Sequence, residues 1–438
     1  MMRPNSLNLI LLIFLMSSPI LGHASCTRNV AVAGYDGQGM NTGLGNINVT
    51  DNYIQPPGSI IATSVVNYAP GYSYPSPDTV IYTCDQTDIG SIYEMFATNG
   101  DDLYGGFYTI GTEDGLSGFY QNKIHYTGIK LTHLNSGQAF LRTWQQYPIT
   151  SYLVDGTKIK IRAKDFSAIK VEIAKVSSDG YTSGAVSNYC GTGWQAAGSY
   201  ACTQPNGYVI FKGPGTGSTP AIGSDSATNY QGWPTHWTSI GLGTPPKTNV
   251  TMNTTCVARN VTPTILFQTM SVNDINQGKT VENNISITVE CSNTVQSGTA
   301  SGQTAIGIQT SLEAYQTAQS LGLVNAQGGV SYLLSDGYGT NSMIATGVGI
   351  ALKAPDGQDL PFVGWQNCNG SGSTSTCPGG RDAGWYPILS GATNAGSSSQ
   401  SGYQYFTTQF TAILKKIPSE TVTPGSVQAK GYVLVRIQ

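Results

Sequence analysis

Apolar and polar residues alternate along the last stretch of the chain, residues 423–438. Val427, Ala429, Val433, Val435 and Ile437 fall on odd positions, so an extended strand would place their side chains on one face. A period of two over this length predicts a β-strand with one buried face. Because the alternation runs to the last residue, we expect an uncovered sheet edge beside this strand, which must be blunted or filled by another chain.

Two runs in the N-terminal half, residues 157–164 and 169–176, alternate in the same way. Isoleucine and valine occupy one side of the runs and mainly lysine the other, which predicts a hairpin of two strands joined by a short turn. The lysines have two interpretations: a basic binding surface, or an edge strand whose charges discourage pairing. We favour the second. Helical periodicity is weak throughout, and residues 311–321 are the best candidate.

The C-terminal half contains further candidate strands. Residues 285–291 and 348–352 each alternate, and an Asp-Gly pair that suits a tight hairpin turn follows the second run at residue 356. Another run, residues 405–413, precedes the terminal strand. The first of these runs places Cys291 on an inward face.

Composition supports a loop-rich β protein with short strands. Only 10% of the residues are charged, and 54 of the 438 are glycine. The net charge of -3 argues against nucleic acid as a partner. Because the chain is too long for one small sandwich, we predict two all-β sandwich domains, residues 25–245 and 256–438. Residues 246–255 are the expected linker, at the end of a segment rich in Gly, Pro, Thr, Ser and Asn.

Residues 1–24 are predicted to be a secretory signal. Arg3 is their only charge, residues 7–21 are largely apolar, and small residues stand near the end. The apolar run is too short to argue for a retained membrane span. We therefore expect export through the periplasm to the cell exterior.

All eight cysteines lie after this segment, and an even number in an exported protein predicts disulfides. Pairing between neighbours in the sequence gives Cys26–Cys84, Cys190–Cys202, Cys256–Cys291 and Cys368–Cys377, although other connectivities remain open. No Cys/His spacing suggests a metal site. We expect no metal and no cofactor.

The C-terminal half resembles pilin subunits of the chaperone–usher pathway. In those proteins a glycine opens an alternating last strand, as Gly425 does here, and a G-V-G-I strand precedes an Asp-Gly turn, as in ATGVGIALKAPDGQDLPF, residues 345–362. Ile437 replaces the aromatic residue that usually stands next to last. The resemblance covers about residues 256–438.

This resemblance implies an immunoglobulin-like fold that lacks its seventh strand. A periplasmic chaperone would supply that strand first, and an adjacent pilus subunit would replace it during assembly at an outer-membrane usher. The residues of the chaperone and donor-strand groove would be the odd-numbered set named above, from Val427 to Ile437.

The order of the two domains resembles that of two-domain tip adhesins of chaperone–usher fimbriae. No donor-like extension is expected, because Cys26 follows the signal segment at once. The resemblance implies that the N-terminal domain lies at the fimbrial tip and binds a host glycan or glycoprotein receptor. One alternative is a minor pilus subunit whose N-terminal domain binds a protein.

A sugar site needs exposed aromatic faces and fixed polar groups, and residues 85–147 are rich in both. Trp194, Trp233, His236 and Trp237 form a second aromatic group nearer the linker. The same residue types also fill cores and make turns. The candidate ligand-binding residues are Asp101, Asp102, Tyr104, Tyr120, Asn122, Trp144 and Gln145.

An enzyme is not expected. The chain has no GxSxG, HExxH or P-loop motif. His125 and His133 would lie about 26 Å apart on an unbroken strand, too far to share a metal, although a turn between them would bring them together. With every cysteine paired there is no thiol nucleophile. A secreted hydrolase is therefore the third alternative.

Overall fold

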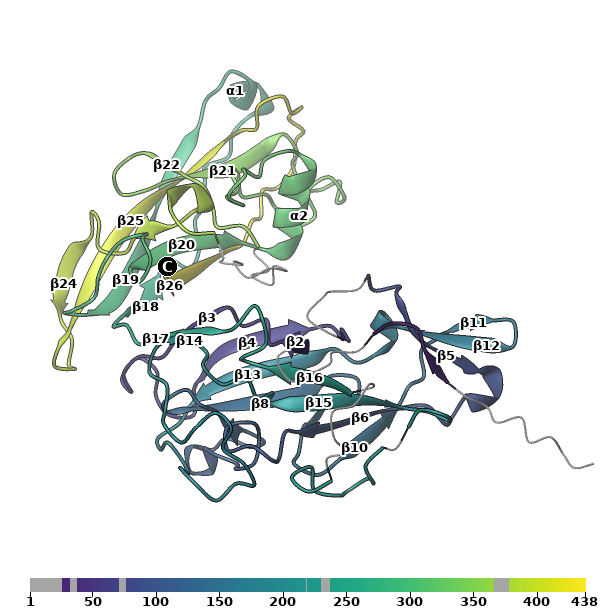
Figure 1. The fold of residues 1–438 in the computed structure, drawn as a ribbon. Helices are drawn as coiled ribbons and strands as arrows, with labels where there is room; N and C mark the ends of the chain where they lie inside the picture. Colours follow the sequence, from purple (N-terminus) through teal and green to yellow (C-terminus); the bar gives the residue numbers. More distant parts are fainter. Residues whose placement is uncertain (1–25, 32–37, 71–75, 218, 230–236, 366–377) are drawn as a thin grey trace, which may run out of the picture.

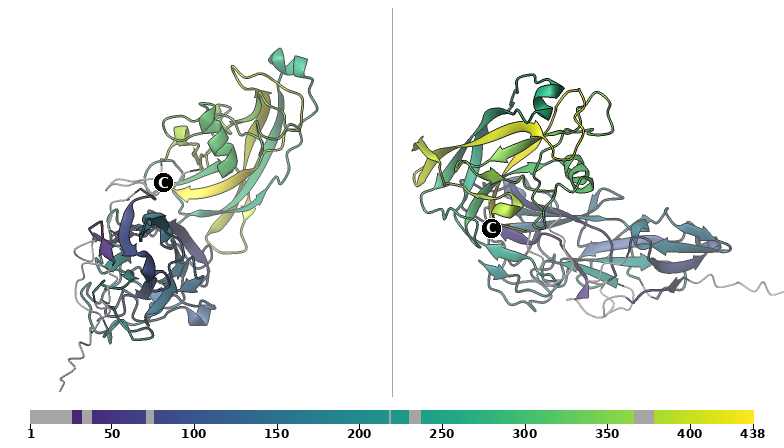
Figure 2. Two further views of the ribbon diagram at one scale, coloured as in Figure 1. Left: turned by 90° about the vertical axis from the view of Figure 1, so that its right-hand side faces the viewer. Right: turned by 90° about the horizontal axis from the view of Figure 1, so that it is seen from above.

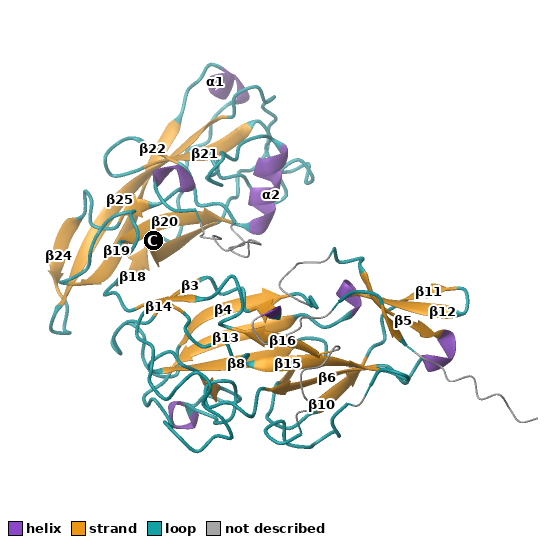
Figure 3. Ribbon diagram, viewed as in Figure 1, coloured by secondary structure: helices purple, strands orange, loops and turns teal. Residues whose placement is uncertain are grey.

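The computed structural model describes residues 26–31, 38–70, 76–217, 219–229, 237–365 and 378–438. Nearly all of the regular structure is β (Figure 3), which confirms the all-β prediction. The expected signal segment lies outside the described residues, as do Trp233, His236 and the Cys368–Cys377 pair. In the part of the chain that is described, no helix is both long and apolar enough to cross a bilayer.

Two sheets pack against each other in the N-terminal domain. Phe96 and Phe211 from the first sheet share one core with Leu131 and Val171 from the second. The first sheet consists, in spatial order, of β10 (Gln145–Pro148), β6 (Tyr93–Thr98), β15 (Gly207–Lys212), β16 (Trp237–Gly241) and β2 (Met40–Asn41). The second consists of β4 (Ile60–Val66), β13 (Ile169–Lys175), β8 (Thr127–His133) and β7 (Tyr120–Gln121), with β9 (Gln138–Ala139) beside β8.

Two smaller sheets lie at opposite ends of this sandwich (Figure 1). The far end carries β1 (Thr27–Arg28), β5 (Val80–Asp85), β12 (Lys158–Arg162) and β11 (Leu153–Asp155), in the order β1-β5-β12-β11. The end next to the C-terminal domain carries β14 (Gly198–Ser199), β17 (Asn249–Thr251) and β3 (Asn46–Asn48).

The predicted hairpin of residues 157–176 is wrong, although both of its strands exist. β12 pairs with β5 and β11, whereas β13 pairs with β4 and β8. A 3₁₀ turn, Ala163–Asp165, sends the chain from one sheet to the other. Each strand is therefore internal to its sheet, so the edge-strand interpretation of the lysines is also wrong. Their charges are paired instead, for example Lys158 with Asp85 and Lys170 with Glu172.

The C-terminal domain is a sandwich of unequal sheets. Ile287 and Phe410 from the large sheet share a core with Ile306 and Ile308 from the small one. The large sheet has the order β18 (Cys256–Val261), β19 (Val281–Ser292), β25 (Tyr403–Lys416), β21 (Val348–Lys353) and β22 (Asp359–Leu360), with β24 (Thr393–Ser397) also paired to β25. The small sheet has the order β23 (Tyr386–Pro387), β20 (Thr304–Thr310) and β26 (Gly431–Ile437).

The predicted C-terminal elements are largely confirmed. β21 and β22 form the hairpin expected around the Asp-Gly pair, with Leu352 opposite Leu360. The weak helical candidate is α2 (Leu312–Ser320), which begins after Ser311, whose hydroxyl accepts a hydrogen bond from Ala314 N. A second short helix is α1 (Val272–Asn276). The terminal strand is shorter than predicted, because regular pairing begins only at Gly431.

The chain passes between the domains at residues 252–255. β17 pairs with β3 and β14 of the N-terminal domain, and β18 pairs with β19 of the C-terminal domain. Figure 1 shows the two strands adjacent at this crossing, and Figure 2 shows from two further sides that the C-terminus also lies beside the N-terminal domain. We therefore propose a boundary at residues 252–255, within the expected linker but closer to its end.

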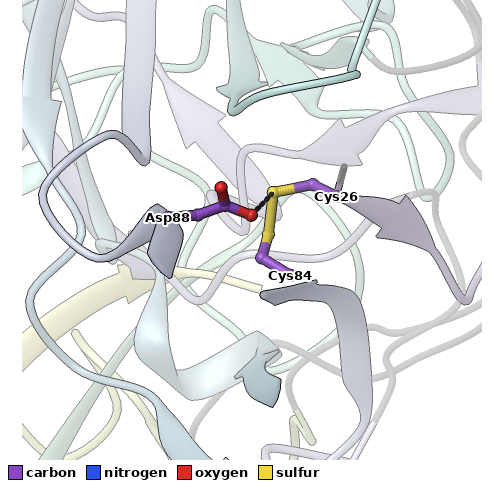
Figure 4. Close-up of side chains that lie close together, drawn as sticks. All are labelled: Cys26, Cys84 and Asp88. Atoms are coloured by element: carbon purple, nitrogen blue, oxygen red, sulfur yellow. Dashed lines mark hydrogen bonds between the residues drawn. A yellow bond between two sulfur atoms is a disulfide. The ribbon is translucent and has the colours of Figure 1, made fainter. Parts of the chain in front are cut away.

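Three of the four expected disulfides are present, namely Cys26–Cys84, Cys190–Cys202 and Cys256–Cys291. Cys256 lies directly opposite Cys291 in the β18–β19 pair, so this bond joins two neighbouring strands. Asp88 Oδ2 lies 3.8 Å from Cys26 Sγ (Figure 4). That carboxylate accepts a hydrogen bond from Asp85 N and closes the turn after β5.

Candidate functional site

The terminal strand β26 has a free backbone edge. Within the described part of the chain it pairs on one side only, with β20, which places Val433 opposite Ile308 and Val435 opposite Ile306. Val433 and Val435 pack against the C-terminal core, yet both stay partly exposed. A strand with an unpaired row of N–H and C=O groups and half-covered inward side chains is a template for a further strand.

An apolar groove runs along this free edge. A cavity of about 440 Å³ lies between residues 261–267 and residues 427–433, and its floor consists of core side chains such as Ile308 and Phe362. A second cavity, of about 680 Å³, continues it between residues 265–272 and 422–428. The two share Leu266, Phe267 and Val427 and so form one groove, which we call the acceptor groove.

The wall opposite β26 is irregular. β18 ends at Val261, and residues 262–270 follow without strand structure. Leu266 on this wall is 77% exposed and lines both cavities of the groove, so a strand that fills the groove would cover it. The acceptor groove therefore has an apolar floor, an apolar wall and one strand edge available for pairing.

Five residues were predicted from the sequence to line this groove. Val427, Ala429 and Val433 line it, and Val435 packs against the same core. Ile437 lines a different cavity at the domain junction. The predicted inward face of β26 therefore matches the groove over most of its length.

The predicted ligand-binding residues of the N-terminal domain do not form an exposed site. The side chains of Asp102, Tyr104, Tyr120, Asn122 and Trp144 are all buried, with at most 5% exposed. Trp144 packs in a small core with Met95 and Tyr208. A buried ring offers no face to a sugar, so these residues are corrected to structural positions.

Hydrogen bonds explain most of these buried polar groups. Asp102 accepts from the backbone N–H groups of Tyr104 and Tyr189 at 2.9 and 3.1 Å. Asn122 holds the turn before β8 through Thr127 and Ile124. Gln145 is half-buried and accepts from Leu141 N at 3.0 Å.

Asp101 is the exception among the predicted residues. Its Oδ1 atom is buried and has no hydrogen-bond partner. Burial, reinforced by the charge of Asp102, raises the pKa of Asp101 to about 6. Asp101 as a whole is only half-buried, so the expectation that it binds a ligand stays a prediction.

A row of rings lies at the surface of the N-terminal domain. His125 is 4.3 Å from the Tyr126 ring and 6.4 Å from Trp194, which in turn meets Tyr104 edge-on at 5.3 Å. Tyr126 is 39% exposed, the His125 side chain 35%, and Trp194 is half-buried. We call Tyr126, His125 and Trp194 the aromatic row.

The loops hold the aromatic row in place. Tyr126 has a φ of 53°, an uncommon value for a non-glycine residue. Asp179 Oδ1 accepts from Tyr126 N at 2.7 Å and lies 2.9 Å from His125 Nδ1. His125 N donates to Gln195 O and Gln195 N donates to Lys123 O, which brings Trp194 alongside. The sequence indicated Trp194, but Tyr126 was missed because no periodicity marks a residue in a turn.

The two histidines do not share a site. A turn separates His125 from β8, whereas His133 ends that strand, is fully buried, stacks on Phe96 and lies 3.4 Å from Glu94. The two groups of potential metal ligands in the described part of the chain both consist of a disulfide and one aspartate. Disulfide sulfurs carry no thiolate charge, so these groups are not metal sites.

Comparison with known proteins gives a family for the C-terminal part of the chain. The model of the fimbrial protein family matches residues 247–438. A search of curated proteins found no match.

Among solved structures, the chain is similar to the P pilus rod subunit PapA, with 15% identity over 42% of this chain and 99% of that one and a TM-score of 0.24. It is also similar to the CupB6 tip adhesin from Pseudomonas aeruginosa, with 11% identity over 95% and 93% of the two chains and a TM-score of 0.23. A chaperone–tip adhesin complex of CFA/I fimbriae biogenesis shows 8% identity over 90% and 97%, with a TM-score of 0.20.

The family match begins two residues before β17 and includes every strand of the C-terminal sandwich. It contains both β26 and the acceptor groove. The pilin resemblance expected for this part of the chain is confirmed by the match of residues 247–438 to the fimbrial protein family.

Proposed function

We propose that this protein is a fimbrial tip adhesin. The C-terminal domain joins the chain to the fimbria by accepting a strand in the acceptor groove, and the N-terminal domain attaches the bacterium to a host-cell glycan. The free edge of β26 above an apolar groove is the observation that carries this proposal. A donated strand would pair with β26 and cover Val433, Val427 and Leu266 together.

The expected partners follow from this arrangement. A periplasmic chaperone covers the acceptor groove before assembly, an outer-membrane usher receives the complex, and an adjacent pilus subunit supplies the permanent strand. The protein is then exposed at the fimbrial tip. These partners share one requirement, an extended segment with alternating apolar side chains, because side chains on every second position of an added strand face the groove.

The assembly part of the proposal is tested by Val433→Asp in the full chain. Val433 faces the acceptor groove, so a carboxylate there would be buried without a partner once a strand is added. We expect loss of chaperone capture and of incorporation into fimbriae, measured by co-purification and by immunolabelling. Ser397→Asp, on the exposed strand β24, is the control and should assemble normally. Normal incorporation of the Val433 variant would contradict a groove at this face.

The attachment part rests on the aromatic row. Exposed rings can cover the apolar face of a pyranose, and Asp179, which contacts His125 and Tyr126, is a polar group beside them. We expect a glycan array probed with the full chain to give a signal that Trp194→Ala reduces about tenfold, the loss expected for a stacked ring worth roughly 1.5 kcal/mol. Leu153→Ala, on β11 at the far end of the domain, is the control.

The glycan array also separates this proposal from its main alternative. No glycan signal, together with fimbriae that contain the protein, would favour a minor pilus subunit whose N-terminal domain binds a protein. Equal glycan binding by the Trp194 and Leu153 variants would be consistent with an adhesin but would show that the aromatic row is not part of its glycan site.

A further inference from the structure

A cavity of about 550 Å³ lies where the two domains meet. Leu44 and Asn46 line it from the N-terminal domain, and Trp385 and residues 434–438 line it from the C-terminal domain. Leu434 and Trp385 belong to a small cluster separate from the main core. The cavity therefore lies on the outer face of the β23-β20-β26 sheet, away from the apolar floor of the acceptor groove.

Arg436 brings a positive charge to this cavity without a matching negative one. Its guanidinium lies 4.1 Å from the centre of the Trp385 ring. It donates to Pro378 O at 2.9 Å and to Gln438 Oε1 at 3.0 Å, and both acceptors are neutral. Arg436 makes no ion pair with any described carboxylate, and burial lowers its pKa to about 10. A partly buried cation without a carboxylate is costly to maintain.

Two further donors at the cavity lack acceptors. Trp385 is 1% exposed and its Nε1 atom has no hydrogen-bond partner. The Nε2 atom of Gln438 is also buried without a partner. Buried donors are nearly always paired in folded proteins, so two unpaired donors beside a cation without a carboxylate indicate a missing acceptor.

Among the described residues, none supplies an acid that pairs with Arg436. Residues 366–377, which directly precede Pro378, contain neither aspartate nor glutamate. A carboxylate from outside the chain has the appropriate chemistry, since it accepts two hydrogen bonds from an arginine and further ones from neutral N–H groups.

We propose that the strand which fills the acceptor groove carries an acidic side chain that enters this cavity and pairs with Arg436. This inference rests on strand addition as the function of the groove. A strand added beside β26 places every second side chain on the outer face, about 5 Å from its neighbours on β26. One of those side chains would lie next to Arg436.

Such a pair would select the partner. A neighbouring subunit with a glutamate or aspartate at this position would give Arg436 the carboxylate that it lacks. A lysine or an apolar residue there would leave the guanidinium unpaired or repelled. The apolar floor of the groove would accept many alternating strands, so the outer face would supply the discrimination.

The test uses the full chain and synthetic peptides of about 15 residues, long enough at about 3.3 Å per residue to span the groove. The peptides alternate valine and threonine, and each threonine in turn is replaced by glutamate or by glutamine. At one position we expect the glutamate peptide to bind about tenfold more tightly than its glutamine counterpart. The preference should shrink as salt is raised.

Arg436→Gln should remove this preference, whereas Arg381→Gln, which breaks the exposed pair with Asp356, should leave it intact. Because the readout is a ratio of two affinities, a variant with a smaller folded fraction lowers both and leaves the ratio unchanged. Equal binding of all glutamate and glutamine peptides to the unaltered chain would overturn the acidic contact but retain strand addition. If no peptide binds, the proposal of strand addition is overturned, and the proposed acidic contact with Arg436 is overturned too.

Discussion

Glu290 lies at the centre of the polar contacts between the two domains. It is located on β19 with its side chain fully buried, and it accepts from Tyr53 of the N-terminal domain at 2.8 Å. Arg259 Nε pairs with its other oxygen at 2.6 Å, and Ser398 donates to it as well. Tyr53 also lies under the Arg259 guanidinium, so one carboxylate organises a contact from both domains.

The pKa of Glu290 indicates when these contacts persist. Burial alone would raise it, but hydrogen bonds from Ser398, Tyr53 and Arg259 outweigh burial and hold the pKa of Glu290 below its ordinary value. Asp51, which accepts from Tyr403 across the junction, also has a lowered pKa. When folding lowers the pKa of a carboxyl group, that group stabilises the folded protein at any pH above its pKa in the unfolded chain. This contribution is lost as the pH falls through the pKa that the group has in the folded protein.

We expect Glu290→Gln to lower the free energy of unfolding of the full chain by about 1–3 kcal/mol at pH 7, because a charged acceptor of three hydrogen bonds is lost. Glu282→Gln, on the exposed part of the same strand, is the matched control and should change it little. Thermal unfolding followed at pH 7 and at pH 3 checks both. The difference in stability between the Glu290 variant and the unaltered chain should be smaller at pH 3 than at pH 7. An equal difference at both pH values would show that the charge of Glu290 does not contribute to stability.

At the scale of single elements, periodicity predicted strands well and their partners poorly. The runs that became β12 and β13 both alternate, yet alternation records only which face is buried and not which strand lies alongside. The 3₁₀ turn between them, where Arg162 donates to Asp165 through backbone and side chain, is what separates them into two sheets. The C-terminal hairpin of β21 and β22 was predictable because its Asp-Gly turn fixes the partner locally.

The candidate site shows the same limit. Val433 and its odd-numbered neighbours were found because a groove lined by one strand has a sequence period. Trp144 and Tyr120 were misassigned because aromatic residues near polar ones are as typical of a core with satisfied hydrogen bonds as of a sugar site. Only the fold shows that Trp144 faces Met95, whereas Tyr126 is exposed.

The disulfide between β18 and β19 gives a prediction at this scale. Replacing Cys256 and Cys291 together with alanine opens a loop of 35 residues, for which chain entropy predicts a loss of roughly 3–4 kcal/mol. Because β18 borders the acceptor groove, peptide binding should weaken along with thermal stability. Replacing Cys190 and Cys202, in the other domain, should leave peptide binding unchanged. Full peptide affinity without the β18–β19 bond would show that β18 does not shape the groove.

At the scale of the whole molecule, the position of β17 decides where the chain can be cut. This strand follows the expected domain end at residue 245, yet it pairs with β3 and β14 of the N-terminal domain. The pairing of β17 therefore favours an N-terminal domain that extends beyond residue 245, the end predicted from composition. A segment rich in Gly, Pro and Thr can still contribute a short strand.

A fragment of residues 26–254 should consequently fold alone as a monomer, whereas residues 26–245 should be less stable because β3 and β14 lose the strand between them. Residues 256–438 should aggregate alone and be rescued by an alternating valine–threonine peptide, since the free edge of β26 is otherwise exposed. Size-exclusion chromatography and thermal unfolding measure all three. A stable, monomeric C-terminal fragment without any peptide would mean that the chain completes its own sandwich.

The parallel pairing of β17 with β3 also has a mechanical consequence. In the proposed tip adhesin, tension from the fimbria would reach the N-terminal domain through residues 252–255 and would be applied along β17. Its ladder bonds to β3 cross the strand direction, so they are loaded together in shear and not peeled apart one at a time. The contacts of Tyr53 and Tyr403 lie off this load path and would part first. The two domains would then swing into line with the force while each remained folded.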